Sequence, residues 1–139
     1  MTGKTMASVH WSFWVIGVIG LIFNLLGCMN YISQMNAEMV ASMPEAYRTI
    51  VEIRPVWGSA AFAIAVFGGA LGCILLLLRM SVAVYVLIAS LVGAVVAQVP
   101  FFGVADIPVG AWIGWMSQLI VGAFLVWYSI WAKRRAWLG

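Results

Sequence analysis

The chain has 139 residues, of which 65% are hydrophobic and only 8% are charged. A soluble domain has about 25% charged residues, so this composition excludes an ordinary water-soluble globular fold. The net charge of +3 does not indicate nucleic acid as a partner, since three of the seven basic residues stand together after the last apolar segment. The partner that the composition predicts is the lipid bilayer.

Four apolar segments follow one another along the chain, and each is close to the roughly 20 residues that a helix needs to cross a bilayer. They comprise residues 11–33, 56–78, 81–99 and 110–132. Backbone groups in lipid must form their hydrogen bonds within their own segment, which favours helices over strands. The sequence therefore predicts one all-α membrane domain, residues 1–139, with four transmembrane helices in an antiparallel bundle.

The three connections between these segments differ in character. Only Arg79 and Met80 separate the second segment from the third, which predicts a tight antiparallel hairpin. Pro100 and Pro108 discourage helix formation in the loop 100–109. The first connection, residues 34–55, is long for a compact bundle and is expected to have structure of its own.

Helical spacing of apolar residues marks that first connection, at Met39, Met43, Tyr47 and Ile50. Pro44 and Glu45 suit the first turn of a helix. We therefore expect a short amphipathic helix over residues 44–53, with its apolar face on the bundle or on the membrane surface. An extension of the first transmembrane helix beyond Gln34 is a further possibility that the pattern leaves open.

Lys and Arg residues divide unequally between the two sides of the predicted domain. One side has Lys4, Arg79, Lys133, Arg134 and Arg135, and the other has Arg48 and Arg54. Because cytoplasmic loops carry the excess of Lys and Arg, this division predicts that both termini are cytoplasmic. Residues 133–139 are then a cytoplasmic tail.

Uncharged polar side chains within or beside the apolar segments are the candidate site residues. They are Asn24, Asn30, Gln34, Gln98 and Gln118. One interpretation is that they form hydrogen bonds between helices and only specify packing. The other is that they line a polar cavity open to the outside and bind a small neutral solute, such as a polyhydroxyl compound or an amide.

Glycines at helical spacing give the first two segments small faces. They are Gly17, Gly20 and Gly27 in the first segment and Gly68 and Gly72 in the second. Such faces let helices approach closely, either within the bundle or between copies of the chain. They favour a homo-oligomer, and they also leave open a scaffold protein that packs against another membrane protein.

Several kinds of chemistry are disfavoured. No Asp, Glu, Lys, Arg or His lies deep in an apolar segment, which argues against proton-coupled transport and against the small multidrug exporters, which depend on a carboxylate in the first helix. The only histidine, His10, has no partner, so neither an enzyme nor a cofactor is expected. Met35, Met39 and Met43 would need one uninterrupted helix to bind Cu(I), so no metal site is predicted.

Three stretches carry a family resemblance: FNLLGCMNYI, the short MPEAY element and RPVWGSAAFAIAVFGGALGCILLLLR. With these, most of residues 11–100 resembles a group of small bacterial four-helix inner-membrane proteins, some of which are described as sugar transporters. The resemblance implies a location in the bacterial inner membrane and favours transport of a solute. It implies no role for any residue.

Overall fold

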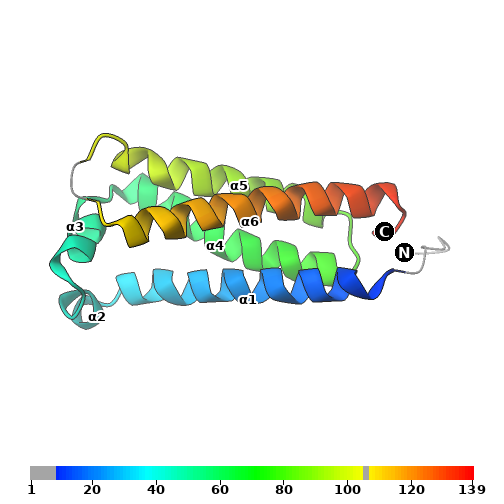
Figure 1. Ribbon diagram of the computed structural model, residues 1–139, viewed down its shortest axis with the longest axis horizontal. Helices are drawn as coiled ribbons and strands as arrows, with labels where there is room; N and C mark the ends of the chain where they lie inside the picture. The colour runs from blue at the N-terminus through cyan, green and yellow to red at the C-terminus, as the bar shows by residue number, and fades with distance from the viewer. Residues whose placement is uncertain (1–8, 105–106) are drawn as a thin grey trace.

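The computed structural model describes residues 9–104 and 107–139, and within them it is helical without strands. Four long helices form a bundle, as Figure 1 shows: α1 (Trp11–Gln34), α4 (Val56–Leu77), α5 (Ala83–Gln98) and α6 (Val109–Arg134). Together with the short 3-10 helix η1 (Val99–Phe101) that extends α5, these are four segments long and apolar enough to cross a membrane. The protein is a polytopic membrane protein, and the predicted all-α four-helix bundle is confirmed.

The predicted boundaries agree closely with the observed ones, except around the third segment. Predicted as residues 81–99, it is α-helical from Ala83 to Gln98 and then tightens into η1. Pro100 explains this change, because it has no N–H to continue the α-helical pattern and it restricts the residue before it. Its position in the first turn of η1 is one that proline tolerates.

Two short helices cross one end of the bundle, which we call the α3 end. They are α2 (Ala37–Ala41) and α3 (Glu45–Ile53), and α3 confirms the helix predicted over 44–53. In place of an extension of α1, the chain breaks and restarts at Asn36, whose side chain accepts hydrogen bonds from the N–H groups of Glu38 (3.0 Å) and Met39 (3.3 Å). Because of this break, Met35, Met39 and Met43 do not share one helix.

At the opposite end, which we call the terminal end, α1 begins and α6 ends (Figure 1). Residues 133–139, predicted as a tail, instead begin in the last turn of α6 and then fold back at Ala136, which has a φ of 60°. Trp137 and Leu138 are buried in a cluster with Phe13 and Tyr128. This cluster closes the bundle at the terminal end.

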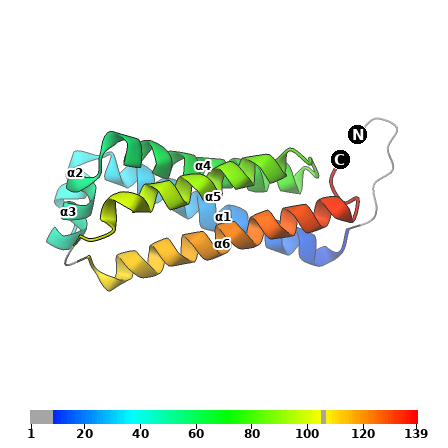
Figure 2. The ribbon, with the colours of Figure 1, turned by 90° about the horizontal axis from the view of Figure 1, so that it is seen from above.

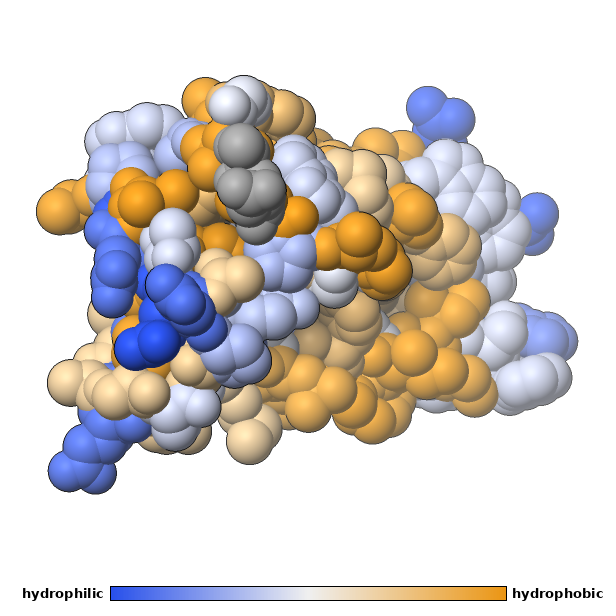
Figure 3. Space-filling model, turned by 60° about the vertical axis from the view of Figure 1, so that its left-hand side comes forward, coloured by the Kyte–Doolittle hydropathy of each residue, from blue (hydrophilic) through white to orange (hydrophobic). Residues whose placement is uncertain are grey.

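The surface supports a membrane-embedded arrangement. Figure 3 shows hydrophilic residues at both ends and a band of hydrophobic residues between them. Ile19 in α1 and Ile120 in α6 are 61% and 69% exposed. Apolar side chains with this exposure need a solvent of hydrocarbon, so the band marks the surface that faces lipid.

Candidate solute-binding cavity

Helices α1 and α6 meet near the terminal end and separate toward the α3 end, where Figure 2 shows them on opposite sides of the bundle. Leu125 of α6 packs so closely on Gly20 of α1 that a Cβ at Gly20 would lie 3.1 Å from its Cδ2. Nearer the α3 end, a Cβ at Gly114 would meet no atom within 4 Å. The divergence of these two helices creates a cavity between them.

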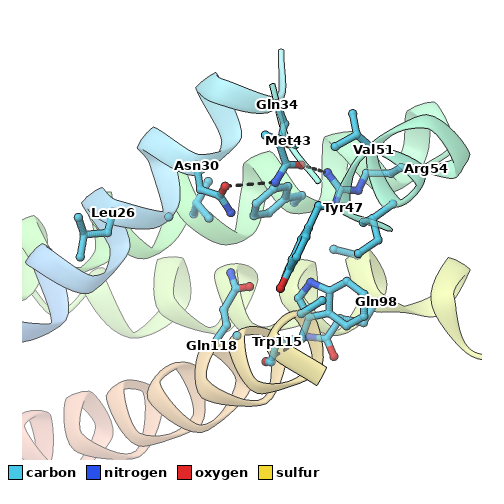
Figure 4. Close-up of a pocket in the computed structure, with 18 of the residues that line it drawn as sticks. Leu26, Asn30, Gln34, Met43, Tyr47, Val51, Arg54, Gln98, Trp115 and Gln118 are labelled. Atoms are coloured by element: carbon cyan, nitrogen blue, oxygen red, sulfur yellow. Dashed lines mark hydrogen bonds between the residues drawn. The ribbon is translucent and has the colours of Figure 1, made fainter. Parts of the chain in front are cut away.

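The cavity has a volume of about 560 Å³ and is lined by residues of α1, α3, α4, α5 and α6 (Figure 4). This volume lies within the range of about 300–1,000 Å³ that is typical of small-molecule sites. Toward the terminal end the cavity stops at the buried cluster of Cys73, Leu87 and Leu125. Only a space of about 10 Å³ lies below Asn24 and Gln118, too small for more than about one water molecule.

All five predicted site residues line this single cavity: Asn24, Asn30, Gln34, Gln98 and Gln118. They come from α1, α5 and α6, so the fold brings together side chains that are up to 94 positions apart in the sequence (118 − 24). That they bind a solute stays a prediction. Their hydrogen bonds show how much of each side chain remains for a ligand.

Two of these amides are engaged in packing. Asn24 donates from Nδ2 to the carbonyl oxygen of Gly20 (2.8 Å) and lies 3.8 Å from the sulfur of Cys73. Gln98 is 4% exposed, and its Nε2 donates to the carbonyl oxygen of Trp115, 3.3 Å away on α6. The interpretation that polar groups specify helix packing therefore holds for these two residues.

Two of the other three amides, Gln118 and Asn30, keep more of their hydrogen-bonding capacity. Gln118 makes no hydrogen bond with any residue that the structure describes and points toward the cavity in Figure 4. Asn30 is exposed and accepts at Oδ1 from Nε2 of Gln34 (3.3 Å). The side chains of Gln118 and Asn30 therefore leave donors and acceptors for a bound molecule, whereas Gln34 is engaged at both ends of its amide, by Asn30 and by Arg54.

Arg54 is the cavity residue that the sequence interpretation missed. It caps the C-terminus of α3 in an extended conformation (φ −68°, ψ 122°), because the following Pro55 disfavours the helical region. Gly58, one turn into α4, leaves room for the side chain: a Cβ there would lie 3.2 Å from Cγ of Arg54. The guanidinium thus reaches the cavity from the corner between α3 and α4.

Contacts hold this guanidinium in place without a carboxylate. Its Nη1 donates to Oε1 of Gln34, and its central carbon lies 4.9 Å from the ring centroid of Phe62 and 5.6 Å from that of Phe101. Its Nε is buried and has no acceptor among the residues that the structure describes. Burial lowers the pKa of Arg54, partly offset by Tyr31, but an arginine remains charged. An unsatisfied buried donor costs about 1–3 kcal/mol.

The cavity-facing side of α3 is the apolar side that the sequence pattern predicts. Tyr47, Ile50, Val51 and Arg54 recur at helical spacing and all line the cavity. Ile50 is buried against Phe101 of η1 and Ala111 in the first turn of α6, so α3 is packed on both of these elements. This register, which placed Arg54 on the same side as Tyr47 and Ile50, was the signal that could have identified it.

The predicted packing glycines all contact side chains of this same chain. A Cβ would approach Leu77 at Gly17, Leu125 at Gly20, Val66 at Gly27, Ser90 at Gly68 and Leu87 at Gly72. The small faces are therefore occupied within the bundle. Homo-oligomerisation stays a prediction, and these glycines do not provide a free surface for it.

Among the residues that the structure describes, no group of three or more His, Cys, Asp and Glu side chains gathers as metal ligands do. Comparisons with protein-family models, with curated proteins and with solved structures found no match for this chain. Function therefore has to be inferred from the cavity itself.

Proposed function

We propose that this membrane protein binds a small polar solute in the cavity between α1 and α6, as a step in moving it across the bilayer. The observation that supports this function is the convergence of Asn24, Gln98 and Gln118 from three helices on one cavity. Polar side chains at membrane depth are costly and commonly mark substrate pathways.

The shape of the cavity favours a carrier or receptor over an open pore. Its closed floor at Leu125 and the buried cluster at the terminal end leave entry from the α3 end. Passage to the other side would require a second arrangement in which α1 and α6 separate at the terminal end. The unequal division of Lys and Arg supports an α3 end outside the cell and both termini in the cytoplasm, and the bacterial inner membrane is the location that the family resemblance implies.

The alternative function, a scaffold without transport, has less support. It depended on a small surface at Gly68 and Gly72 that a partner or a second copy could cover. That surface is covered by Ser90 and Leu87 of α5. No other described feature favours a particular protein partner.

Gln118 offers the sharpest test, because it lines the cavity and supports no described hydrogen bond. The purified protein would be reconstituted in vesicles and offered labelled sugars, polyols, amides and small organic acids. We expect at least one class to bind or enter, and Gln118→Leu to weaken this by about tenfold, the effect of losing one hydrogen bond of about 1.4 kcal/mol.

Ser117→Ala is the matched control, since Ser117 precedes Gln118 on α6 and does not line the cavity. It should leave binding unchanged, and both variants should elute from gel filtration like the parent protein. Absence of binding and entry for every class would refute the proposed function. Equal activity of parent and Gln118→Leu would show that the cavity is not the site.

A further inference from the structure

The charge inside the cavity defines the ligand more narrowly than the amides do. Among the described residues that line it, Arg54 is the charged one, and no Asp or Glu lies beside it there. The guanidinium forms no ion pair with the described part of the chain. A fixed positive charge at the entrance of a cavity with mostly apolar walls attracts a negative group.

This inference rests on the proposed function. We propose that the ligand is an organic anion whose carboxylate or phosphate group is bound by Arg54. An apolar body attached to that group extends deeper into the cavity. The neutral solute predicted from the sequence is thereby replaced by a charged one. Three features of the site support an organic anion as the ligand.

First, the guanidinium has donors left for a ligand. Of its five N–H groups, the structure records one hydrogen bond, from Nη1 to Gln34. Arg48 also has a buried Nε without an acceptor, but Arg48 does not line the cavity. Of these two arginines, Arg54 is the one that combines unused donors with a place on the cavity wall, and this difference makes Arg48 a natural control.

Second, the guanidinium is held rigid before any ligand binds. Phe62 and Phe101 lie near it, and Gln34 fixes one edge and is itself bonded to Asn30, as the dashed lines in Figure 4 show. A planar group that is already oriented loses little freedom when it binds a carboxylate or a phosphate. An arginine that is packed in this way is better oriented for binding than an arginine on a surface in water.

Third, the walls beyond Arg54 are apolar. Phe62 and Val66 of α4 and Ala111 and Trp115 of α6 line the cavity between its entrance and its floor. Gln34 and Asn24 are ten positions apart on α1, which separates the polar entrance from the polar floor by about 15 Å along the helix. Over that length Asn30 and Gln118 offer amides, but most of the wall is hydrocarbon or aromatic and fits an apolar body.

The test uses protein in lipid nanodiscs and radiolabelled acetate, butyrate and phenylacetate, with phenylacetamide as the neutral counterpart. We expect affinity to rise from acetate to phenylacetate and to exceed that for phenylacetamide. Arg54→Gln should weaken phenylacetate binding by about tenfold or more while leaving phenylacetamide unaffected, and Arg54→Lys should weaken it less. Arg48→Gln should bind phenylacetate like the parent protein.

A second variant keeps the arginine but displaces it. Gly58→Leu would push on Cγ of Arg54, since even a Cβ at Gly58 would lie 3.2 Å away. It should lose phenylacetate binding as Arg54→Gln does. Gel filtration and circular dichroism would show whether Arg54→Gln and Gly58→Leu are folded. If one of these two variants is not folded, the other still provides the test.

Native mass spectrometry would distinguish a free acid from a lipid headgroup as the source of the anion. Nanodiscs of phosphatidylcholine with some phosphatidylglycerol would supply the lipid. Retention of phosphatidylglycerol by the parent protein but not by Arg54→Gln, without displacement by phenylacetate, would support the lipid. Displacement by phenylacetate would support the soluble acid.

Failure of this inference can be told apart from failure of the proposed function. If a neutral solute binds in a manner that depends on Gln118, while neither phenylacetate nor phosphatidylglycerol depends on Arg54, the anion is refuted and the cavity remains the site. If no probe of any charge binds, both proposals fall. Equal phenylacetate affinity of parent and Arg54→Gln would overturn the assignment directly.

Discussion

Asn24 and Gly69 act as one unit at the centre of the bundle. The missing side chain of Gly69 on α4 makes room for the carboxamide of Asn24 on α1, and a Cβ there would overlap Oδ1 at 2.0 Å. Asn24 is 7% exposed and bonded to its own helix, so it cannot move away freely. The pair fixes how α1 lies on α4 at the level of the cavity floor.

This coupling predicts a non-additive pair of substitutions. Gly69→Ala should destabilise the protein by about 1–3 kcal/mol, because it overpacks the Asn24 site. In an Asn24→Ala background the same change should cost much less, since the overlapping oxygen is gone and Oγ of Ser90, 3.1 Å from the new Cβ, is the close neighbour that remains. Thermal unfolding in detergent, followed by circular dichroism, would measure both. Equal costs of Gly69→Ala in the two backgrounds would show that Asn24 and Gly69 are not in contact.

Helix α4 is the central element, because it packs on α1 with one face and on α5 with another. Its glycines make this double packing possible. At Gly72 a Cβ would lie 2.6 Å from Cδ2 of Leu87 and 3.5 Å from its backbone nitrogen. The tight turn at Arg79 and Met80 then holds α4 and α5 together as a hairpin on which α1 and α6 are placed.

Gly72→Leu should therefore separate α4 from α5 and lower the unfolding temperature sharply, by a core-overpacking cost of about 1–3 kcal/mol or more. Leu71→Ala is the matched control, because Leu71 is 50% exposed on the face that contacts lipid. Unfolding temperature and gel-filtration volume would be compared for both. A Gly72→Leu protein with unchanged unfolding temperature and a changed oligomer size would contradict an intrachain role for this glycine.

At the scale of the whole molecule, apolar length and charge asymmetry were sufficient to predict four helices and their order. The convergence of five amides was also within reach, because each lies in or next to a predicted helix. Arg54 was within reach only in part: the register of α3 places it on the side of Tyr47 and Ile50, but the pattern does not show that Pro55 keeps this C-cap residue extended, with its side chain at the cavity. The divergence of α1 and α6 was not predictable, because it depends on long-range packing at Leu125 and Trp137.

Because the floor of the cavity is closed at Leu125, we expect it to open from the α3 end and not from the terminal end, which substituted cysteines can test. The native Cys28 and Cys73, both buried and free, would be replaced by Ala. Single cysteines would then be introduced at Gln118 inside the cavity and at Leu125 beneath its floor. Glu38 at the α3 end and Lys133 at the terminal end would serve as surface references. A charged, membrane-impermeant thiol reagent would be added to intact cells or to inside-out vesicles.

We expect the cysteine at position 118 to react from the same side as the one at position 38, and not from the side of position 133. The cysteine at position 125 should react from neither, because Leu125 is 2% exposed. Labelling of positions 38 and 118 in intact cells would place the α3 end outside, as the Lys and Arg distribution predicts. Labelling of position 118 from both sides would instead show that the cavity opens alternately or continuously, and would favour passage of the ligand over binding alone.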